Sequence, residues 1–202
     1  SDYRDFSNTS SYWGGGLAST YFWGQHVQLR LSYEYALRLP TSRELFGTGD
    51  DIERGNSSLK PETSNNINVG VTASPIDAGN HRLTIDAAFQ YREIDDYIRR
   101  TTNNDNGRAS SKNDGGVRNL GGDFGIRYAF ADLFFISGNF SYIDMRSMTR
   151  YVAGTQRESK IYKERIPAIP YMYGNAEAGI TLRDVFLKGA TLDIHYMMNY
   201  IR

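Results

Sequence analysis

Apolar and polar side chains alternate along unusually long segments, and this alternation limits the possible folds more than any other feature. Between residues 27 and 39 every odd position is apolar or aromatic, whereas the even positions include Arg30, Glu34 and Arg38. Successive side chains of a β-strand point to opposite faces, so the pattern predicts a strand with one apolar and one polar face. No segment keeps a helical period over its length.

The same alternation returns along the rest of the chain. It is clear at residues 83–92 and 120–128, weaker at 134–142, 172–182 and 192–200, and least regular at 15–23. A further strand is expected to descend after residue 65. About eight strands result, which predicts an all-β fold.

Strand length separates a membrane protein from a soluble one. Residues 27–39 would extend over about 43 Å at roughly 3.3 Å per residue. At a tilt of about 45° this strand rises roughly 30 Å, which is the thickness of the hydrocarbon core of a bilayer. Strands of globular proteins usually have about 5 or 6 residues. The sequence therefore predicts an antiparallel transmembrane β-barrel, with apolar side chains facing lipid.

The predicted connections alternate between two kinds. Short ones fall at residues 24–26, 74–80, 130–132 and 184–189, and long polar ones at 40–65, 101–117 and 147–171. Outer-membrane barrels have short periplasmic turns and long external loops. Both ends of the chain fall on the long-loop side, whereas a complete barrel is expected to have both ends in the periplasm. We therefore expect the chain to be part of a larger barrel.

Composition and spacing exclude several other functions. The formal net charge is zero, which gives no basic excess for nucleic acid. There is no cysteine, so thiolate metal sites and disulfides are excluded. His26, His81 and His195 are far apart and indicate no metal site. No motif suggests catalysis, so we expect no enzyme, no catalytic residue and no cofactor.

Two motifs in the first long connection resemble those of TonB-dependent outer-membrane receptors. The first, at residues 37–47, reads LRLPTSRELFG, and the second, at residues 55–71, reads GNSSLKPETSNNINVGV. The family has an Arg-x-Pro-Ser-x-x-Glu-Leu-aromatic-Gly run followed by Gly-Asn-x-x-Leu-Lys-Pro-Glu. Thr41 stands where the family usually has serine. The segments FQYREIDDYI, NLGGDFGIRY and RIPAIPYMYGNAEAGI also resemble later strands of the family, so the resemblance covers nearly the whole chain.

The resemblance implies a 22-stranded barrel in the outer membrane of a Gram-negative bacterium, closed by an N-terminal plug. Residues 1–202 would form part of this one barrel domain, in its C-terminal half, without the plug and with about three strands missing after Arg202. The implied partners are outer-membrane lipid, the plug, the TonB complex and an extracellular ligand. The implied function is energised uptake of a scarce ligand, such as a siderophore, haem, cobalamin or an oligosaccharide.

Two sets of candidate residues follow. In the motifs, Arg38 and Glu44 are expected to brace the base of the loop, with capture of an anionic ligand as the alternative. The acidic group Asp50, Asp51 and Glu53, with Arg54, is interpreted as a solvated loop tip, with contact to a ligand or a cation as the alternative. The family motif residues, expected to be mainly structural, are Arg38, Pro40, Glu44, Leu45, Gly47, Gly55, Asn56, Leu59, Lys60, Pro61 and Glu62.

The second set consists of charged side chains on the polar face of the strands. On a lumen wall, opposite charges on neighbouring strands would pair across the ladder, each pair contributing roughly 0.2–1 kcal/mol. They would give the plug a polar surface to rest on, with a role in permeation as the alternative. The lumen-facing charges are Arg30, Glu34, Arg82, Asp86, Arg92, Asp123, Arg127, Glu177, Arg183 and Asp193.

Two other functions remain open at this point. Eight strands could close a passive porin or a small structural barrel, although the chain ends and the receptor motifs oppose this. A soluble β-sandwich binding module also alternates, but its strands are shorter and its apolar face is turned inward.

Overall fold

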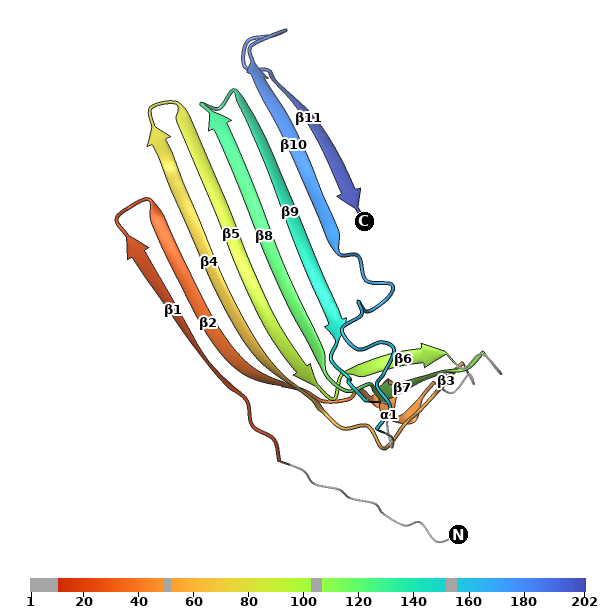
Figure 1. Cartoon of the computed structure of the whole chain (residues 1–202). Helices are drawn as coiled ribbons and strands as arrows, with labels where there is room; N and C mark the ends of the chain where they lie inside the picture. Colours follow the sequence, from red (N-terminus) through yellow and green to blue (C-terminus); the bar gives the residue numbers. More distant parts are fainter. Residues whose placement is uncertain (1–10, 49–51, 103–106, 152–155) are drawn as a thin grey trace.

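One curved, antiparallel sheet of eight strands makes up most of the molecule. The computed structural model describes residues 11–48, 52–102, 107–151 and 156–202. The strands of the large sheet lie in the order β1-β2-β4-β5-β8-β9-β10-β11, so each strand pairs with the next large-sheet strand along the chain (Figure 1). They are β1 (Gly15–Trp23), β2 (Val27–Arg38), β4 (Glu62–Ala78), β5 (His81–Asp95), β8 (Val117–Phe130), β9 (Phe134–Ser147), β10 (Met172–Arg183) and β11 (Thr191–Ile201).

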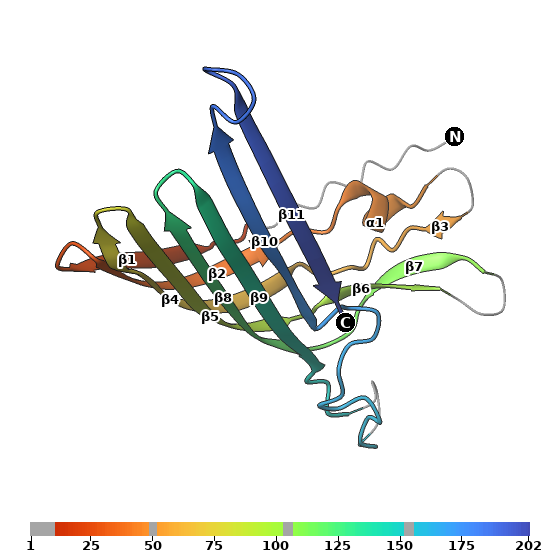
Figure 2. The ribbon, with the colours of Figure 1, turned by 90° about the horizontal axis from the view of Figure 1, so that it is seen from above.

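The sheet bends like a section of a cylinder wall when it is seen from above (Figure 2). Its four short turns lie together at one end, and the three long connections lie at the other end (Figure 1). The first residue of β1 and the last residue of β11 are both at the long-connection end. The strands have 9 to 17 residues, which is the length that a tilted membrane strand requires.

The sequence predicted the strands well, and the turns less well. Strand β1 has the predicted bounds, and β2 ends one residue before the predicted end at Leu39. The predicted connection at 74–80 is wrong, because β4 continues through it to Ala78 and only Gly79 and Asn80 form the turn. The register of β4 against β5 shifts between Ala73 and Ile76, and this bulge hides the alternation in the sequence.

The long connections hold regular structure that the sequence analysis did not predict. A five-residue helix, α1 (Ser42–Phe46), lies in the first connection, which the sequence analysis describes only as a long polar segment. Strands β3 (Glu53–Arg54), β6 (Ile98–Thr102) and β7 (Ala109–Asn113) form a small sheet in the order β3-β7-β6. This small sheet draws on the first and second long connections, and it lies beside α1 (Figure 1).

Buried apolar side chains lie at one place only among the described residues. They gather where the large sheet meets the small sheet: Leu59, Ile94, Ile98, Ala109 and Val117. Over most of the large sheet, by contrast, the apolar face is open; Leu31 is 56 % exposed and Ile136 is 55 % exposed. No other described element covers this face, which is what a wall in contact with lipid requires and a sandwich does not.

We expect Gly174→Ala to destabilise the sheet, because a Cβ at Gly174 would lie 2.6 Å from the backbone oxygen of Asn139 on β9. The strands would have to move apart, at a cost of about 1–3 kcal/mol. The matched control is Gly122→Ala, whose Cβ would meet its nearest atom at an ordinary 3.6 Å. Denaturant unfolding in detergent micelles measures both variants, and equal stabilities would contradict the prediction.

Candidate functional site

The ends of β2 and β4 carry a charged cluster at the base of the first long connection. Arg38 and Glu62 are direct partners across the ladder. The Arg38 guanidinium donates from Nη2 to Oε1 of Glu44 over 2.8 Å, and its Nε lies 3.5 Å from Oε2 of Glu62. One guanidinium therefore joins α1 to both strands that the connection leaves and enters.

Helix α1 begins with a capping box. The Thr41 hydroxyl accepts a hydrogen bond from the backbone N–H of Glu44 over 3.3 Å, and the Glu44 carboxylate accepts from the Thr41 N–H over 2.7 Å. Pro40, directly before the cap, supplies no backbone donor to β2. The spacing Thr-x-x-Glu is the sequence signal that could have revealed the helix. Glu44 thus serves the helix cap and the Arg38 pair together.

Gly47 and Gly55, the two motif glycines, allow the backbone at the end of α1 to pack closely against the backbone of residues 53–55. Gly47 has a φ of +78°, in the region that favours glycine, and a Cβ there would lie 2.7 Å from the backbone nitrogen of Gly55. A Cβ at Gly55 would lie 2.6 Å from the backbone oxygen of Leu45. Only glycine fits at either position, so both glycines of the motif have a structural role in this close approach.

The second motif binds the first long connection to the second one. The Asn56 side chain donates from Nδ2 to the backbone oxygen of Ser111 over 3.0 Å. The backbone of Lys60 exchanges two hydrogen bonds with the Asn113 side chain, at 2.9 and 3.0 Å. Leu59 is buried and Pro61 is half-buried at this junction. The motif therefore holds two neighbouring loops together.

Glu62, the first residue of β4, also binds the second long connection at this junction. Its side chain is almost buried, with the residue 8 % exposed, and Oε1 accepts a hydrogen bond from the backbone N–H of Ile98 over 2.5 Å. Burial and the Glu62 carboxylate raise the pKa of the nearby Tyr97 phenol. The start of the second loop is therefore fixed to the first residue of β4.

Glu53 is a second buried carboxylate, which the sequence analysis placed at a solvated tip. The residue is only 5 % exposed. Its Oε2 accepts from Nε of Arg43 over 2.6 Å, and its Oε1 lies 3.5 Å from Nε of Arg100 on β6. The solvated interpretation is wrong for Glu53, because β6 supplies a cation that no local spacing reveals. Asp50 and Asp51 lie outside the described residues.

All ten charges of the second set lie on one face of the large sheet. The pairing registers place them level with polar or small partners, for example in the row Gln28, Thr72, Asp86, Gly125, Asn139, Asn175 and Asn199. The opposite face carries Leu29, Leu31, Val69, Phe89 and Ile126. Apart from the bulge in β4, the pairing registers therefore separate the charged face from the apolar face across eight strands.

The expected pairing of opposite charges across the ladder is found for Arg82 with its ladder partner Asp77, whereas Arg30, Asp86 and Asp123 bind hydroxyl groups instead. Hydroxyl groups lie between them: Arg30 donates to Thr72 over 3.1 Å, and Thr72 donates to Asp86 over 2.6 Å. Asp123 likewise accepts from Ser141 over 2.5 Å. For Arg30 and Asp86 the physical reason is spacing, since β4 lies between their strands and contributes Thr72.

The charges near the short turns have other partners. Arg183 donates to Asp132 over 3.2 Å, and Arg82 lies 3.6 Å from Asp77. The Arg127 guanidinium lies over the Phe135 ring, 4.1 Å from its centre. These side chains keep the polar face charged down to the end with the short turns.

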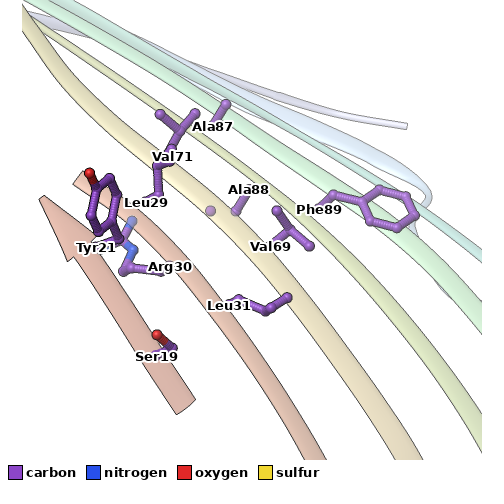
Figure 3. Close-up of a pocket in the computed structure, with 11 residues that line it drawn as sticks. Ser19, Tyr21, Leu29, Arg30, Leu31, Val69, Val71, Ala87, Ala88 and Phe89 are labelled. Atoms are coloured by element: carbon purple, nitrogen blue, oxygen red, sulfur yellow. The ribbon is translucent and has the colours of Figure 1, made fainter. Parts of the chain in front are cut away.

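A shallow hollow crosses β1, β2, β4 and β5, mainly on the apolar face. Its lining includes Leu29, Leu31, Val69, Val71 and Phe89, with Ala87 leaving space between larger side chains (Figure 3). Polar lining is limited to Ser19, Tyr21 and Arg30. Such a surface suits an acyl chain better than a polar solute.

The described residues form neither a metal site nor a membrane-spanning helix. In the part of the chain that the structure describes, no three histidine, aspartate or glutamate side chains gather closely enough to hold a metal ion. The described helix is too short and too polar to cross a membrane.

Comparisons with known proteins agree with this geometry. Residues 1–198 match the family model described as "TonB dependent receptor-like, beta-barrel". No curated protein sequence matches the chain. Among solved structures, the copper transporter OprC and the FrpB iron transporter of Neisseria meningitidis (F3-3 variant) each superpose with a TM-score of 0.63 at 14% identity. Each match covers 94% of this chain, but only 31% of OprC and 26% of FrpB.

We expect Glu62→Ala to loosen the junction of the two loops, because the buried Ile98 N–H loses its acceptor. The cost is about 1–3 kcal/mol, visible as faster amide exchange at Ile98 and faster proteolysis within residues 96–116. Glu62→Gln keeps an acceptor and should retain most of the protection.

The matched control for this prediction is Glu158→Ala. Glu158 is an exposed loop carboxylate whose nearest cation, Nε of Arg150, is 3.7 Å away, and such pairs contribute at most about 1 kcal/mol. Equal protection in Glu62→Ala and Glu158→Ala would show that Glu62 does not hold the loops.

Proposed function

Because the chain belongs to the TonB-dependent receptor-like β-barrel family, we propose that it forms part of the wall of a receptor that takes up a scarce ligand with energy from the TonB complex. Receptors of this family lie in the outer membrane of Gram-negative bacteria, and the antiparallel sheet matches part of their barrel. The supporting observation is the strand pairing that puts every charge of the second set on one face. The chain itself has no catalytic role.

In this proposal the apolar face meets lipid and the polar face lines the lumen. Neighbouring strands of the sheet form hydrogen bonds between their backbone N–H and C=O groups, as the hydrocarbon region requires. Strands β1 and β11 each have one edge without a partner among the described strands. Further strands of the receptor complete the barrel, to the 22 of the family pattern, and a plug domain rests against the lumen charges.

The loop junction is the part of the chain that we propose serves ligand binding. The motif residues hold the first and second long connections as one unit. Their role is to fix the base from which loop side chains meet the ligand. The related copper and iron transporters support a metal-containing ligand, such as a siderophore complex or haem, ahead of cobalamin or an oligosaccharide.

A passive porin is the second candidate function. Eight long strands with a charged face would suit a water-filled pore. The match of residues 1–198 to the receptor family favours the receptor.

Uptake by cells that carry the full-length receptor tests the proposal. We expect accumulation of labelled ferric-siderophore or haem to require both the receptor and a functional TonB, and to stop when the membrane potential is dissipated. Uptake that continues without TonB would identify a passive pore instead.

We expect Val69→Lys to impair insertion, because Val69 lies on the apolar face near the middle of β4. A lysine facing the bilayer midplane costs about 2–4 kcal/mol. The matched control is Asn68→Lys, one residue earlier on the polar face. The folded fraction in lipid vesicles, from heat-modifiable gel mobility, is the measurement; equal losses in both variants would contradict the assignment of faces.

A further inference from the structure

The turn between β10 and β11 carries a run of apolar side chains at its tip. Val185 is 48 % exposed, Phe186 is 78 % exposed and Leu187 is 74 % exposed. Large apolar side chains in consecutive exposed positions indicate a surface that another apolar phase covers.

This turn has a defined structure. The Asp184 N–H donates to the Ala190 oxygen over 2.8 Å, and the Asp184 carboxylate accepts from the Gly189 N–H over 2.5 Å. Ala190 donates to the Leu187 oxygen over 2.9 Å. Asp184 and Gly189 have positive φ angles of 57° and 83°. The backbone is therefore closed on itself, and the apolar side chains are held outside it.

The other short turns differ in composition. The β1–β2 turn is Gly-Gln-His, the β4–β5 turn is Gly-Asn, and the β8–β9 turn is Ala-Asp-Leu. Among the four short turns that the structure describes, only the β10–β11 turn has three consecutive large apolar side chains within the turn itself; the β8–β9 turn has Leu133 alone, next to Phe134 of β9. If apolar side chains were a general property of this end of the barrel, all four short turns would carry them. The run at residues 185–187 therefore has a cause specific to the β10–β11 turn.

The apolar run continues the apolar face of its own hairpin. Leu182 pairs with Leu192, and Ile180 with Ile194, on that face directly before the turn. Lys188 follows the run, where its ammonium can reach the level of lipid phosphates while its stem lies along apolar surface. An apolar tip that continues a lipid-facing stripe and ends in a cation fits the edge of a bilayer.

We propose that the β10–β11 turn inserts Phe186 and Leu187 into the periplasmic leaflet of the outer membrane, with Lys188 at the phosphate level. The occupant of this surface is phospholipid. The inference rests on the proposed orientation of the apolar face toward lipid, which a separate label tests.

The absence of cysteine in the chain makes the test direct. Phe186→Cys is spin-labelled in the full-length receptor, with any cysteines elsewhere replaced, and reconstituted in vesicles of phosphatidylethanolamine and phosphatidylglycerol. Collision rates with oxygen, which enters the acyl region, and with a water-soluble nickel chelate report the depth of the label. Gln25→Cys in the polar β1–β2 turn is the matched control at the same end of the barrel, and Val69→Cys reports the apolar face.

We expect the ratio of oxygen to nickel collisions at residue 186 to be several times that at residue 25, and below that at residue 69, because residue 69 lies nearer the middle of the bilayer. A ratio at residue 186 equal to that at residue 25, with residue 69 in lipid, overturns the inference and leaves the proposed orientation intact. A low ratio at residue 69 as well overturns the orientation itself.

Discussion

The hydrogen-bond ladder between neighbouring strands is the constraint on which the rest of the structure depends. Inside a bilayer, a backbone N–H has no water to bond, so each strand must find its partners on both sides. The six inner strands of the large sheet have a partner on each side, apart from one bulge in β4, and β1 and β11 have one partner each among the described strands. Because the pairing fixes the register, it also decides which side chain faces lipid.

Alternation in the sequence was enough to predict the large sheet. A strand such as β2 has two different faces, and its period of two is visible without any knowledge of its neighbours. Strand β4 shows the limit of this reasoning, since the shift between Ala73 and Ile76 breaks the period while the strand continues. The hairpin turn was therefore placed too early along the chain.

The loop structure was less predictable, for two different reasons. Helix α1 could have been found, because its capping box is local and visible as Thr41 and Glu44. The burial of Glu53 could not be predicted from the sequence, because Arg100, which lies close to it, is 47 positions later in the chain. The small sheet likewise joins β3 to β7, which are distant in sequence and have no alternation of their own. Contacts between loops leave no periodic signal in either segment.

The junction around Arg38 and Glu62 lies between the large sheet and the outer parts of the first and second long connections. Because two neighbouring loops share one clamp at their base, a displacement of one would carry the other with it. The same clamp isolates β2, β4 and β5 from sequence changes farther out. Substitutions among the outermost loop residues can therefore leave this frame unaltered.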